Sequence, residues 1–396
     1  LNVEKARLDR VFSSEQIKPI IIAIGCGVGE EFDMEKVKRL DYVDVCKWLG
    51  ISLVIFGHMK MPGEVLQWIY AFHMPLFFVL SGYTYRAQKI DKDFLMKKIK
   101  TIYVPFLLFA LIFCSGEMSS WAYIAYGSRN ALEMAGTYTV LWFLPCFFAA
   151  VLVFSLLMNI GNRSKHKVWI LAAGVAVMLV GAKACEMLKG GQPMIAKYGY
   201  PLNFDMALVG AVFMFAGYCF RRMIDSFKGS DALIDRISND LVYTCAYSTK
   251  KQILLIVTVV VLFVVTGFTA YMNLPESLNP ACAHVEMSVG AFGNWGLFFA
   301  NALLMSMALI GLSMLVDKWV NKKKLLLFIG QNSLTILCVH GTILLAASKV
   351  LPKVGLTGVD DMSLMIQGIV SYVIVIAASI PVILLIKRFV PNLVGK

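Results

Sequence analysis

The sequence predicts an all-α integral membrane protein, a bundle of about ten transmembrane helices with both termini in the cytoplasm. Three observations support this prediction: the composition, the length of the apolar runs and the placement of the basic residues. Of the 396 residues, 59% are hydrophobic and 16% are charged, whereas soluble domains are about 45–50% apolar and about 25% charged. We therefore expect a multi-pass protein of the plasma membrane.

The apolar runs have the length that a membrane crossing requires. A helix needs about 20 mostly apolar residues to cross the hydrocarbon core, and several runs of this kind follow one another along the chain. They are predicted at residues 42–59, 66–85, 99–115, 138–159, 168–185, 203–220, 252–271, 293–315, 325–347 and 364–386.

Local signals support individual spans in turn. The second span begins with Trp68 and Tyr70, an aromatic pair typical of the membrane interface, and it contains Pro75, which we expect to kink the helix. The third span follows a run of lysines at 97–100, which marks its cytoplasmic end. The sixth span begins at Asn203, a residue type that favours a helix start.

The basic residues predict the orientation. Cytoplasmic loops are enriched in Lys and Arg, and these residues crowd the second, fourth, sixth and eighth connections: Arg86, Lys89, Lys92, Lys97 and Lys98; Arg163, Lys165 and Lys167; Arg221, Arg222, Lys250 and Lys251; Lys318, Lys322, Lys323 and Lys324. The even-numbered loops and both termini are therefore predicted to be cytoplasmic. The same distribution accounts for the formal net charge of +12, so we expect the lipid bilayer and not nucleic acid as a partner.

The first residues differ in character from the rest of the chain. Residues 1–35 are predicted to be a soluble extension, and residues 36–396 the membrane domain. Two blocks near the start, "LNVEKARLD" and "GCGVGEEFD", resemble the metal-binding domain of the B subunit of DNA gyrase or topoisomerase IV. In that family the catalytic glutamate lies upstream of this piece and the metal-binding aspartates lie downstream. Because this sequence contains neither, we expect no topoisomerase chemistry, and we interpret Met34 as the original start of a fused or misassembled gene.

Six of the ionisable residues inside or at the edges of the predicted spans are candidate site residues. Such residues are costly in a bilayer, so they usually face the bundle interior and mark a site or pathway. They are Asp44, Lys47, His58, His73, Asp205 and His340. Eleven residues separate Lys47 from His58, which places them on nearly the same helix face, roughly 16 Å apart along the axis. With Asp44 one turn earlier, the first span is predicted to carry one continuous polar face.

The other ionisable residues are predicted to lie in the outer half of the membrane. His58, His73, His340 and Asp205 would converge there if the bundle brings their helices together. Each also has a purely structural interpretation: His58 could reach headgroup water, His73 and His340 could hydrogen-bond between helices, and Asp205 could cap its helix. The nine cysteines are scattered singly, and no His or carboxylate spacing suggests a ligand set, so no metal site is expected.

Six blocks in order resemble the acyltransferase 3 family of bacterial membrane proteins. They are "RLDYVDVCKWLGISLVIFGH", "FHMPLFFVLSGY", "KKIKTIYVPFLLF", "LWFLPCFF", "ALVGAVFMFAGY" and "GQNSLTILCVHG", within about residues 36–390. The resemblance implies a ten-helix core that takes an acyl group, usually acetyl, from cytoplasmic acyl-coenzyme A. The acceptor would be a hydroxyl of a cell-surface carbohydrate or another envelope molecule.

The resemblance also implies roles for individual residues. His58 matches the family's proposed catalytic histidine, and Lys47 stands where many members carry an arginine. Lys97, Lys98 and Lys100 stand where many relatives have an Arg-x-x-Arg pair. A lysine offers a point charge and not a bidentate fork, but Asp44, Lys47 and these lysines are still candidates for binding the donor. Lys97, Lys98 and Lys100 could equally do no more than set the topology.

The expected chemistry assigns the remaining candidates. Acyl transfer from a thioester to an alcohol needs a base for the hydroxyl proton and donors for the developing oxyanion. We assign the base to His58 and a second base or an oxyanion donor to His73, with Ser81 and Asn332 as further polar candidates. Two other classes remain open: a transporter or flippase for a carbohydrate or lipid-linked intermediate, and a sensor or scaffold.

Overall fold

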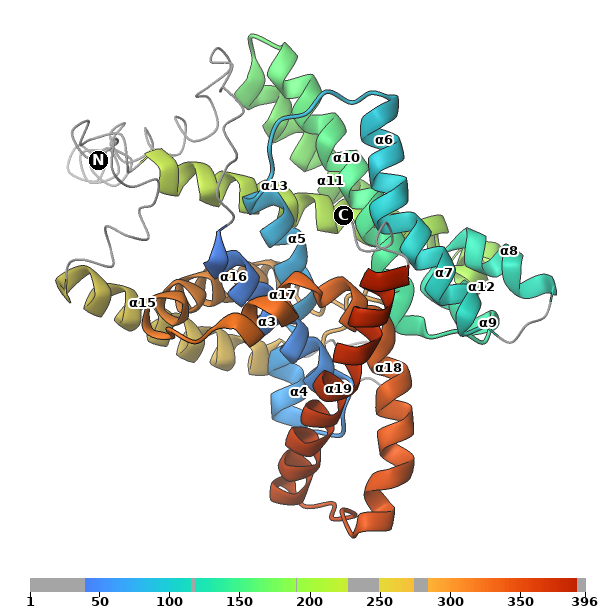
Figure 1. The fold of residues 1–396 in the computed structure, drawn as a ribbon. Coiled ribbons are helices and arrows are strands. Elements are labelled where there is room, and N and C mark those ends of the chain that lie inside the picture. Colours follow the sequence, from blue (N-terminus) through green and yellow to red (C-terminus); the bar gives the residue numbers. More distant parts are fainter. Residues whose placement is uncertain (1–39, 115–117, 190, 227–248, 274–283, 390–396) are drawn as a thin grey trace.

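The computed structural model describes residues 40–389 except 115–117, 190, 227–248 and 274–283, and all regular elements within these ranges are helices (Figure 1). The only strand-like pairing described is one isolated bridge between Glu286 and Ala291. The prediction of an all-α membrane protein is therefore confirmed. The predicted extension at residues 1–35 and its boundary with the membrane domain lie outside the described residues.

The first half of the described chain contains mostly short helices. They are α3 (Asp41–Gly57), α4 (Gly63–Tyr70), α5 (His73–Tyr83), α6 (Lys92–Lys98), the π-helical η1 (Ile99–Tyr103), α7 (Val104–Ile112), α8 (Met118–Tyr126), α9 (Arg129–Met134), η2 (Thr139–Trp142) and α10 (Phe143–Arg163). The second half contains α11 (Lys167–Lys189), α12 (Pro193–Tyr198), η3 (Pro201–Asn203), α13 (Phe204–Ser226), α15 (Thr249–Met272), α16 (Trp295–Trp319), α17 (Lys324–Gln331), α18 (Ser333–Val350), η4 (Leu351–Val354) and α19 (Asp361–Phe389).

Eight helical segments of the described chain are long and apolar enough to cross a membrane. They are Gly63–Tyr83, Thr139–Arg163, Lys167–Lys189, Pro201–Asp225, Gln252–Met272, Trp295–Trp319, Ser333–Lys353 and Asp361–Phe389. Each overlaps one of the predicted spans. The two other predicted spans, 42–59 and 99–115, are also helical, but α3 has only 17 residues and the third span consists of η1 and α7. The predicted orientation of the termini stays a prediction.

Two predicted spans are interrupted in the structure. The span at 66–85 consists of α4 and α5 with a turn at Ala71 and Phe72. Pro75 therefore lies in the first turn of α5, where a proline is tolerated, and the expected kink at Pro75 is instead a break just before it. The span at 325–347 consists of α17 and α18, and Asn332 lies at the break with its side-chain amide donating to the carbonyl of Phe328.

The core forms around α3, α5, α10, α13 and α16. Helices α5 and α13 pack so closely that a Cβ added at Gly217 would lie 2.0 Å from the carbonyl oxygen of Val79. Helix α17 crosses α3 in the same manner, since a Cβ at Gly330 would lie 1.8 Å from the carbonyl oxygen of Asp44. Small residues at such crossings are the usual means of close helix packing in membranes.

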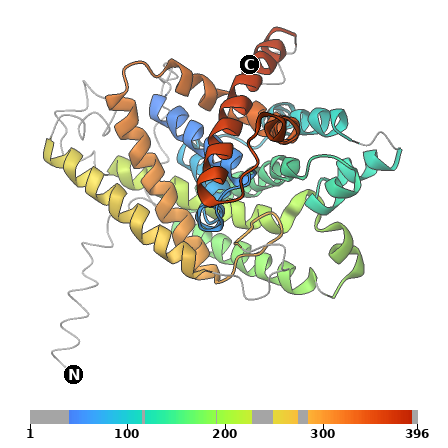
Figure 2. The same cartoon turned by 90° about the horizontal axis from the view of Figure 1, so that it is seen from below.

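The peripheral helices have an exposed apolar face. Helices α15 and α16 lie side by side along one flank (Figure 2), and α18 and α19 form a hairpin that extends from the bundle (Figure 1). Large side chains such as Trp169 of α11, Val264 of α15 and Phe389 of α19 are exposed. Apolar surface of this kind is stable next to lipid tails, so α11, α15 and α19 form the lipid-facing side of the bundle.

Candidate functional site

The N-terminal part of α3 carries a buried ion pair. The Asp44 carboxylate is 1% exposed, and its Oδ1 lies 3.3 Å from the Lys47 ammonium. Gln331 of α17 donates to the other carboxylate oxygen at 3.3 Å. The crossing of α17 over α3 therefore fixes Asp44, and Lys47 is already paired with it.

The continuous polar face predicted for α3 is absent. Ile51 and Val54 lie on the helix face between Lys47 and His58, and both are fully buried in the core. Two polar residues eleven positions apart lie on the same helix face. The residues between them need not be exposed to water, because other parts of the bundle can pack against them. His58 itself lies just past the last residue of α3, Gly57, and it is exposed.

His58 lies against a second histidine, His340 of α18. Their ring centroids are 5.2 Å apart with an angle of 36° between the ring planes. The His340 ring is fully buried, and its Nδ1 lies 2.8 Å from the carbonyl oxygen of Leu337. A ring nitrogen that faces a carbonyl carries the proton, so the other nitrogen holds the lone pair. That nitrogen, Nε2, has no hydrogen-bond partner among the described residues.

His73 completes a cluster of three histidines. It opens α5, is 3% exposed, and points its Nδ1 at the carbonyl oxygen of Ile69 at 2.9 Å. Its ring packs edge-on against Tyr70 at 4.8 Å, and the Tyr70 hydroxyl donates to the carbonyl of Gly57 at 3.0 Å. Since Gly57 directly precedes His58, Tyr70 ties the start of α5 to the end of α3.

The sequence analysis missed a fourth histidine, His284. It lies in the connection between α15 and α16, and its ring centroid is 4.0 Å from that of Tyr70. Burial lowers the pKa of His284, and the Glu286 carboxylate opposes this shift. Glu286 also lies 3.9 Å from the guanidinium of Arg129 in α9. The signal in the sequence is His284-Val285-Glu286, an imidazole and a carboxylate two residues apart in a connection and outside the spans.

Asp205 and Asn332 lie in structural positions. The Asp205 carboxylate accepts from the backbone N–H of Met206 at 2.9 Å at the start of α13, and the charged side chain that acts on it is Lys189. The carboxylate that interacts electrostatically with His73 and His284 is that of Glu286 and not that of Asp205. The Asn332 amide is used at the break between α17 and α18. Within the described ranges, no group of three or more His, Cys, Asp or Glu side chains could hold a metal ion.

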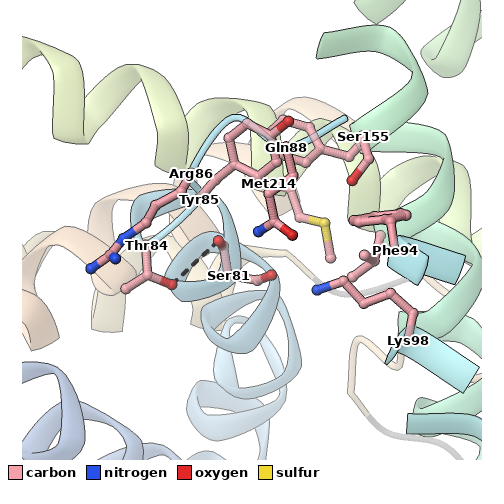
Figure 3. Close-up of a pocket in the computed structure, with 11 residues that line it drawn as sticks. Ser81, Thr84, Tyr85, Arg86, Gln88, Phe94, Lys98, Ser155 and Met214 are labelled. Carbon is pink, nitrogen blue, oxygen red and sulfur yellow. Dashed lines mark hydrogen bonds between the residues drawn. The ribbon is translucent and has the colours of Figure 1, made fainter. Parts of the chain in front are cut away.

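A polar cavity of about 190 Å³ lies at the other end of α5 (Figure 3). It is lined by Ser81, Thr84, Tyr85, Arg86, Gln88, Phe94, Lys98, Val151, Phe154, Ser155 and Met214. Figure 3 shows the Lys98 ammonium pointing into the cavity toward Ser81, whereas the Arg86 guanidinium points away. Two of the predicted candidates, Ser81 and Lys98, thus meet in one cavity. Lys97 and Lys100 are exposed and do not line it.

Helix α5 joins this cavity to the histidine cluster. Ser81 follows His73 by eight residues, which is about 12 Å of axial rise. Phe77 lies between them at helical spacing and is less buried than the other residues of α5 around it. Its ring packs against Phe143 of α10 at 5.9 Å. The cavity and the histidines therefore lie at opposite ends of a single short helix.

A second cavity, of about 320 Å³, lies on a different side of α3. Its lining is mostly apolar and includes Trp48, Phe56 and Tyr372. The Tyr372 hydroxyl accepts from Trp48 Nε1 at 3.2 Å and lies 2.9 Å from the Ser52 hydroxyl. This cavity contains none of the candidate site residues.

Comparisons with known proteins give two different results. A family model described as an acyltransferase domain matches residues 40–388. Curated relatives match a smaller part of the chain. The B subunit of a type 2 topoisomerase from Aquifex aeolicus is 36% identical over 101 residues, which is 24% of this chain and 13% of the relative. The DNA gyrase B subunit of Campylobacter jejuni is 60% identical over 103 residues, 25% of this chain and 12% of the relative. The chain thus spans about an eighth of the length of these relatives, and no solved structure matches.

Proposed function

The chain belongs to the acyltransferase family whose model it matches, and we propose that it is a membrane-bound O-acyltransferase of the plasma membrane. It moves an acyl group from cytoplasmic acyl-coenzyme A to a hydroxyl of a cell-surface carbohydrate or envelope molecule. The acyl group that we propose is acetyl. The observation that carries the proposal is the family match over residues 40–388, in a fold where the ring of His58 packs against the buried His340 and the buried His73 is close enough to act on it electrostatically.

The transfer assigned to this site needs one proton acceptor. The acceptor hydroxyl attacks the thioester carbonyl carbon, the carbon–sulfur bond breaks, and an ester forms. His58 takes the hydroxyl proton and returns it to the departing thiolate, so that coenzyme A leaves as the thiol. An imidazole suits this exchange because its usual pKa lies near neutrality. His58 is exposed, and a substrate hydroxyl can therefore reach it.

The two buried histidines are suited to accept a proton and not to donate a hydrogen bond to an oxyanion. Both His73 and His340 hold their Nδ1 protons against backbone carbonyls, which leaves a lone pair on Nε2. A lone pair accepts a proton and cannot stabilise an oxyanion. Of the two roles predicted for His73, this arrangement favours that of a second base.

The polar cavity is the proposed entry of the donor. Lys98 points into it and can neutralise a phosphate of coenzyme A as a point charge. Ser81 and Thr84 line the same cavity at the end of α5, and the partly buried Phe77 lies between this cavity and His73 along the helix. We assign the pantetheine arm to this side of α5 and not to the face of α3, because Ile51 and Val54 close that face.

A transfer assay on purified protein tests the proposal. In lipid nanodiscs with radiolabelled acetyl-coenzyme A and an envelope carbohydrate extract, the wild type should form base-labile acetyl esters. His58→Ala should reduce the rate at least about 100-fold. The matched control is His166→Ala, because His166 is exposed in the turn between α10 and α11. Full activity of His58→Ala, or no consumption of acetyl-coenzyme A by the wild type, would contradict the proposal.

A further inference from the structure

Residues 284–291, which we call the 284–291 turn, form a closed backbone turn between α15 and α16. The N–H of Glu286 donates to the carbonyl of Ala291 at 2.8 Å, and the N–H of Ala291 donates back at 3.0 Å. Gly290 closes the turn with φ +79, a conformation that favours glycine. The turn bonded in this way fixes the backbone of Glu286, and His284 precedes it by two residues.

Side chains from three other helices hold the 284–291 turn in place. Tyr70 of α4 packs against His284, Arg129 of α9 pairs with Glu286, and Lys189 of α11 donates to the carbonyl of Val289 at 3.3 Å. Because Tyr70 also contacts His73 and bonds next to His58, the turn forms a wall of the histidine cluster. It lies at the end of α5 opposite the polar cavity.

The partly exposed groups of this wall differ in hydrogen-bonding character. The side chains of Glu286 and Arg129 are 17% and 27% exposed, and His284 is half-buried. They offer a carboxylate acceptor, a guanidinium donor and an imidazole that can do either. The charges at the wall balance, with Glu286 and Glu133 against Arg129 and Lys189, so the wall favours a neutral ligand. Carbohydrates present neutral hydroxyl groups that both donate and accept, which matches this set.

We propose that the 284–291 turn is the acceptor-binding wall, in which Glu286 and His284 bind hydroxyl groups of a neutral carbohydrate. They hold the sugar so that one further hydroxyl faces His58. This assignment rests on the proposed acyl transfer, and it separates the two substrates: the donor enters at the Ser81 end of α5 and the acceptor at the His73 end. Glu286 and His284 touch the acceptor and not the reacting bond.

Kinetics with two varied substrates test this division. The probes are acetyl-coenzyme A and an envelope carbohydrate extract from cells that lack the gene. Glu286→Gln and His284→Ala should each raise the KM for the extract about tenfold, because Glu286→Gln weakens a charge-assisted hydrogen bond to a bound hydroxyl and His284→Ala removes a hydrogen bond. The KM for acetyl-coenzyme A should stay within twofold of the wild-type value. Glu286→Asp keeps the charge and should retain most of the affinity for the extract.

The structure offers matched controls. Glu133 pairs with the same Arg129 at 3.7 Å but is 68% exposed, so Glu133→Gln should leave both KM values unchanged, as should His166→Ala. An unchanged KM for the extract in Glu286→Gln and His284→Ala, or a rise in the KM for acetyl-coenzyme A alone, overturns the inference. A wild type that leaves acetyl-coenzyme A intact overturns the proposed function instead, which separates the two failures. If Glu286→Gln lowers the melting temperature, the KM values of His284→Ala and Glu286→Asp for the extract test the inference in its place.

Discussion

At the scale of the residue, each buried histidine bonds backward to its own chain. His73 Nδ1 faces the carbonyl four residues earlier, and His340 Nδ1 faces those three and four residues earlier. This local geometry fixes the tautomer, since a carbonyl can only accept. The reactive nitrogen of each ring is therefore determined by a backbone carbonyl within four residues of the histidine, inside α18 for His340 and across the turn between α4 and α5 for His73. What the rest of the fold adds is the direction in which that nitrogen points.

His340→Phe should separate activity from stability. Phenylalanine keeps a buried ring but removes Nε2, which has no partner among the described residues. We expect transfer to fall about 10–100-fold, because the base next to His58 is lost. The melting temperature in detergent should not fall, because an unpaired buried polar atom costs about 1–3 kcal/mol. A stable variant with wild-type activity would show that His340 is purely structural.

Lys98 and Lys97 should behave differently although they are neighbours in sequence. Lys98 lines the polar cavity, while Lys97 is exposed outside it. Lys98→Met should raise the KM for acetyl-coenzyme A about tenfold through loss of a charged hydrogen bond to phosphate. Lys97→Met is the control and should change it less than twofold. Equal effects of the two substitutions would point to a diffuse charge effect and against a donor site in the cavity.

At the scale of the element, the breaks in helices are what position the site. The turn at Ala71 and Phe72 lets α4 and α5 take different directions, so that His73 begins a helix and Tyr70 can reach back to Gly57. The break at Asn332 lets α17 cross α3 while α18 brings His340 to His58. Continuous helices would carry these residues past one another.

Glycine at the α5–α13 crossing should be essential for stability. Any side chain at Gly217 would meet the carbonyl of Val79, with a Cβ 2.0 Å away. Gly217→Leu should therefore destabilise the protein by about 1–3 kcal/mol or more, measured as a lower melting temperature and a lower yield in the membrane. Gly63→Leu is the control, because nothing lies within 4 Å of a Cβ at Gly63. Similar losses in both variants would contradict this packing argument.

At the scale of the whole molecule, the bundle separates two chemical environments along one helix. The polar cavity with Lys98 lies at one end of α5, and the histidine cluster with the 284–291 turn lies at the other. This division suits an enzyme whose two substrates approach from opposite sides of a membrane. The lipid-facing helices α11, α15 and α19 carry few of the candidate residues, which is consistent with a supporting role.

The orientation of the bundle can be tested by cysteine accessibility. In a background without the native cysteines, Lys165→Cys lies in the turn between α10 and α11, and Val359→Cys lies in the exposed connection before α19. By the distribution of Lys and Arg, a membrane-impermeant thiol reagent added to intact cells should label Val359→Cys and not Lys165→Cys. The reverse pattern would invert the assigned orientation and the direction of transfer.

The site was predicted from the sequence only in part. His58, His73 and His340 stand out because an imidazole is unusual in an apolar run, and the structure brings these three together. Asp205 stands out by the same rule, yet it lies in the first turn of α13 and accepts from the backbone N–H of Met206. His284 and Glu286 lie in a connection, where polar residues are ordinary, so no rule based on the spans could find them. The prediction of a polar face on α3 was wrong, because helical spacing does not determine which residues pack into the core between two polar ones.

The sequence by itself determined the class of the protein and the position of most of its helices. These depend on how much apolar surface each run offers to lipid, which is a local property of the chain. Only the tertiary structure decided which polar groups meet. Three features depend on contacts between residues far apart in sequence. They are the contact of His58 with His340, the position of Glu286 and not Asp205 next to the histidines, and the presence of Lys98 but not Lys97 in the polar cavity. Such contacts depend on close packing at glycines and helix breaks, which a hydropathy pattern does not encode.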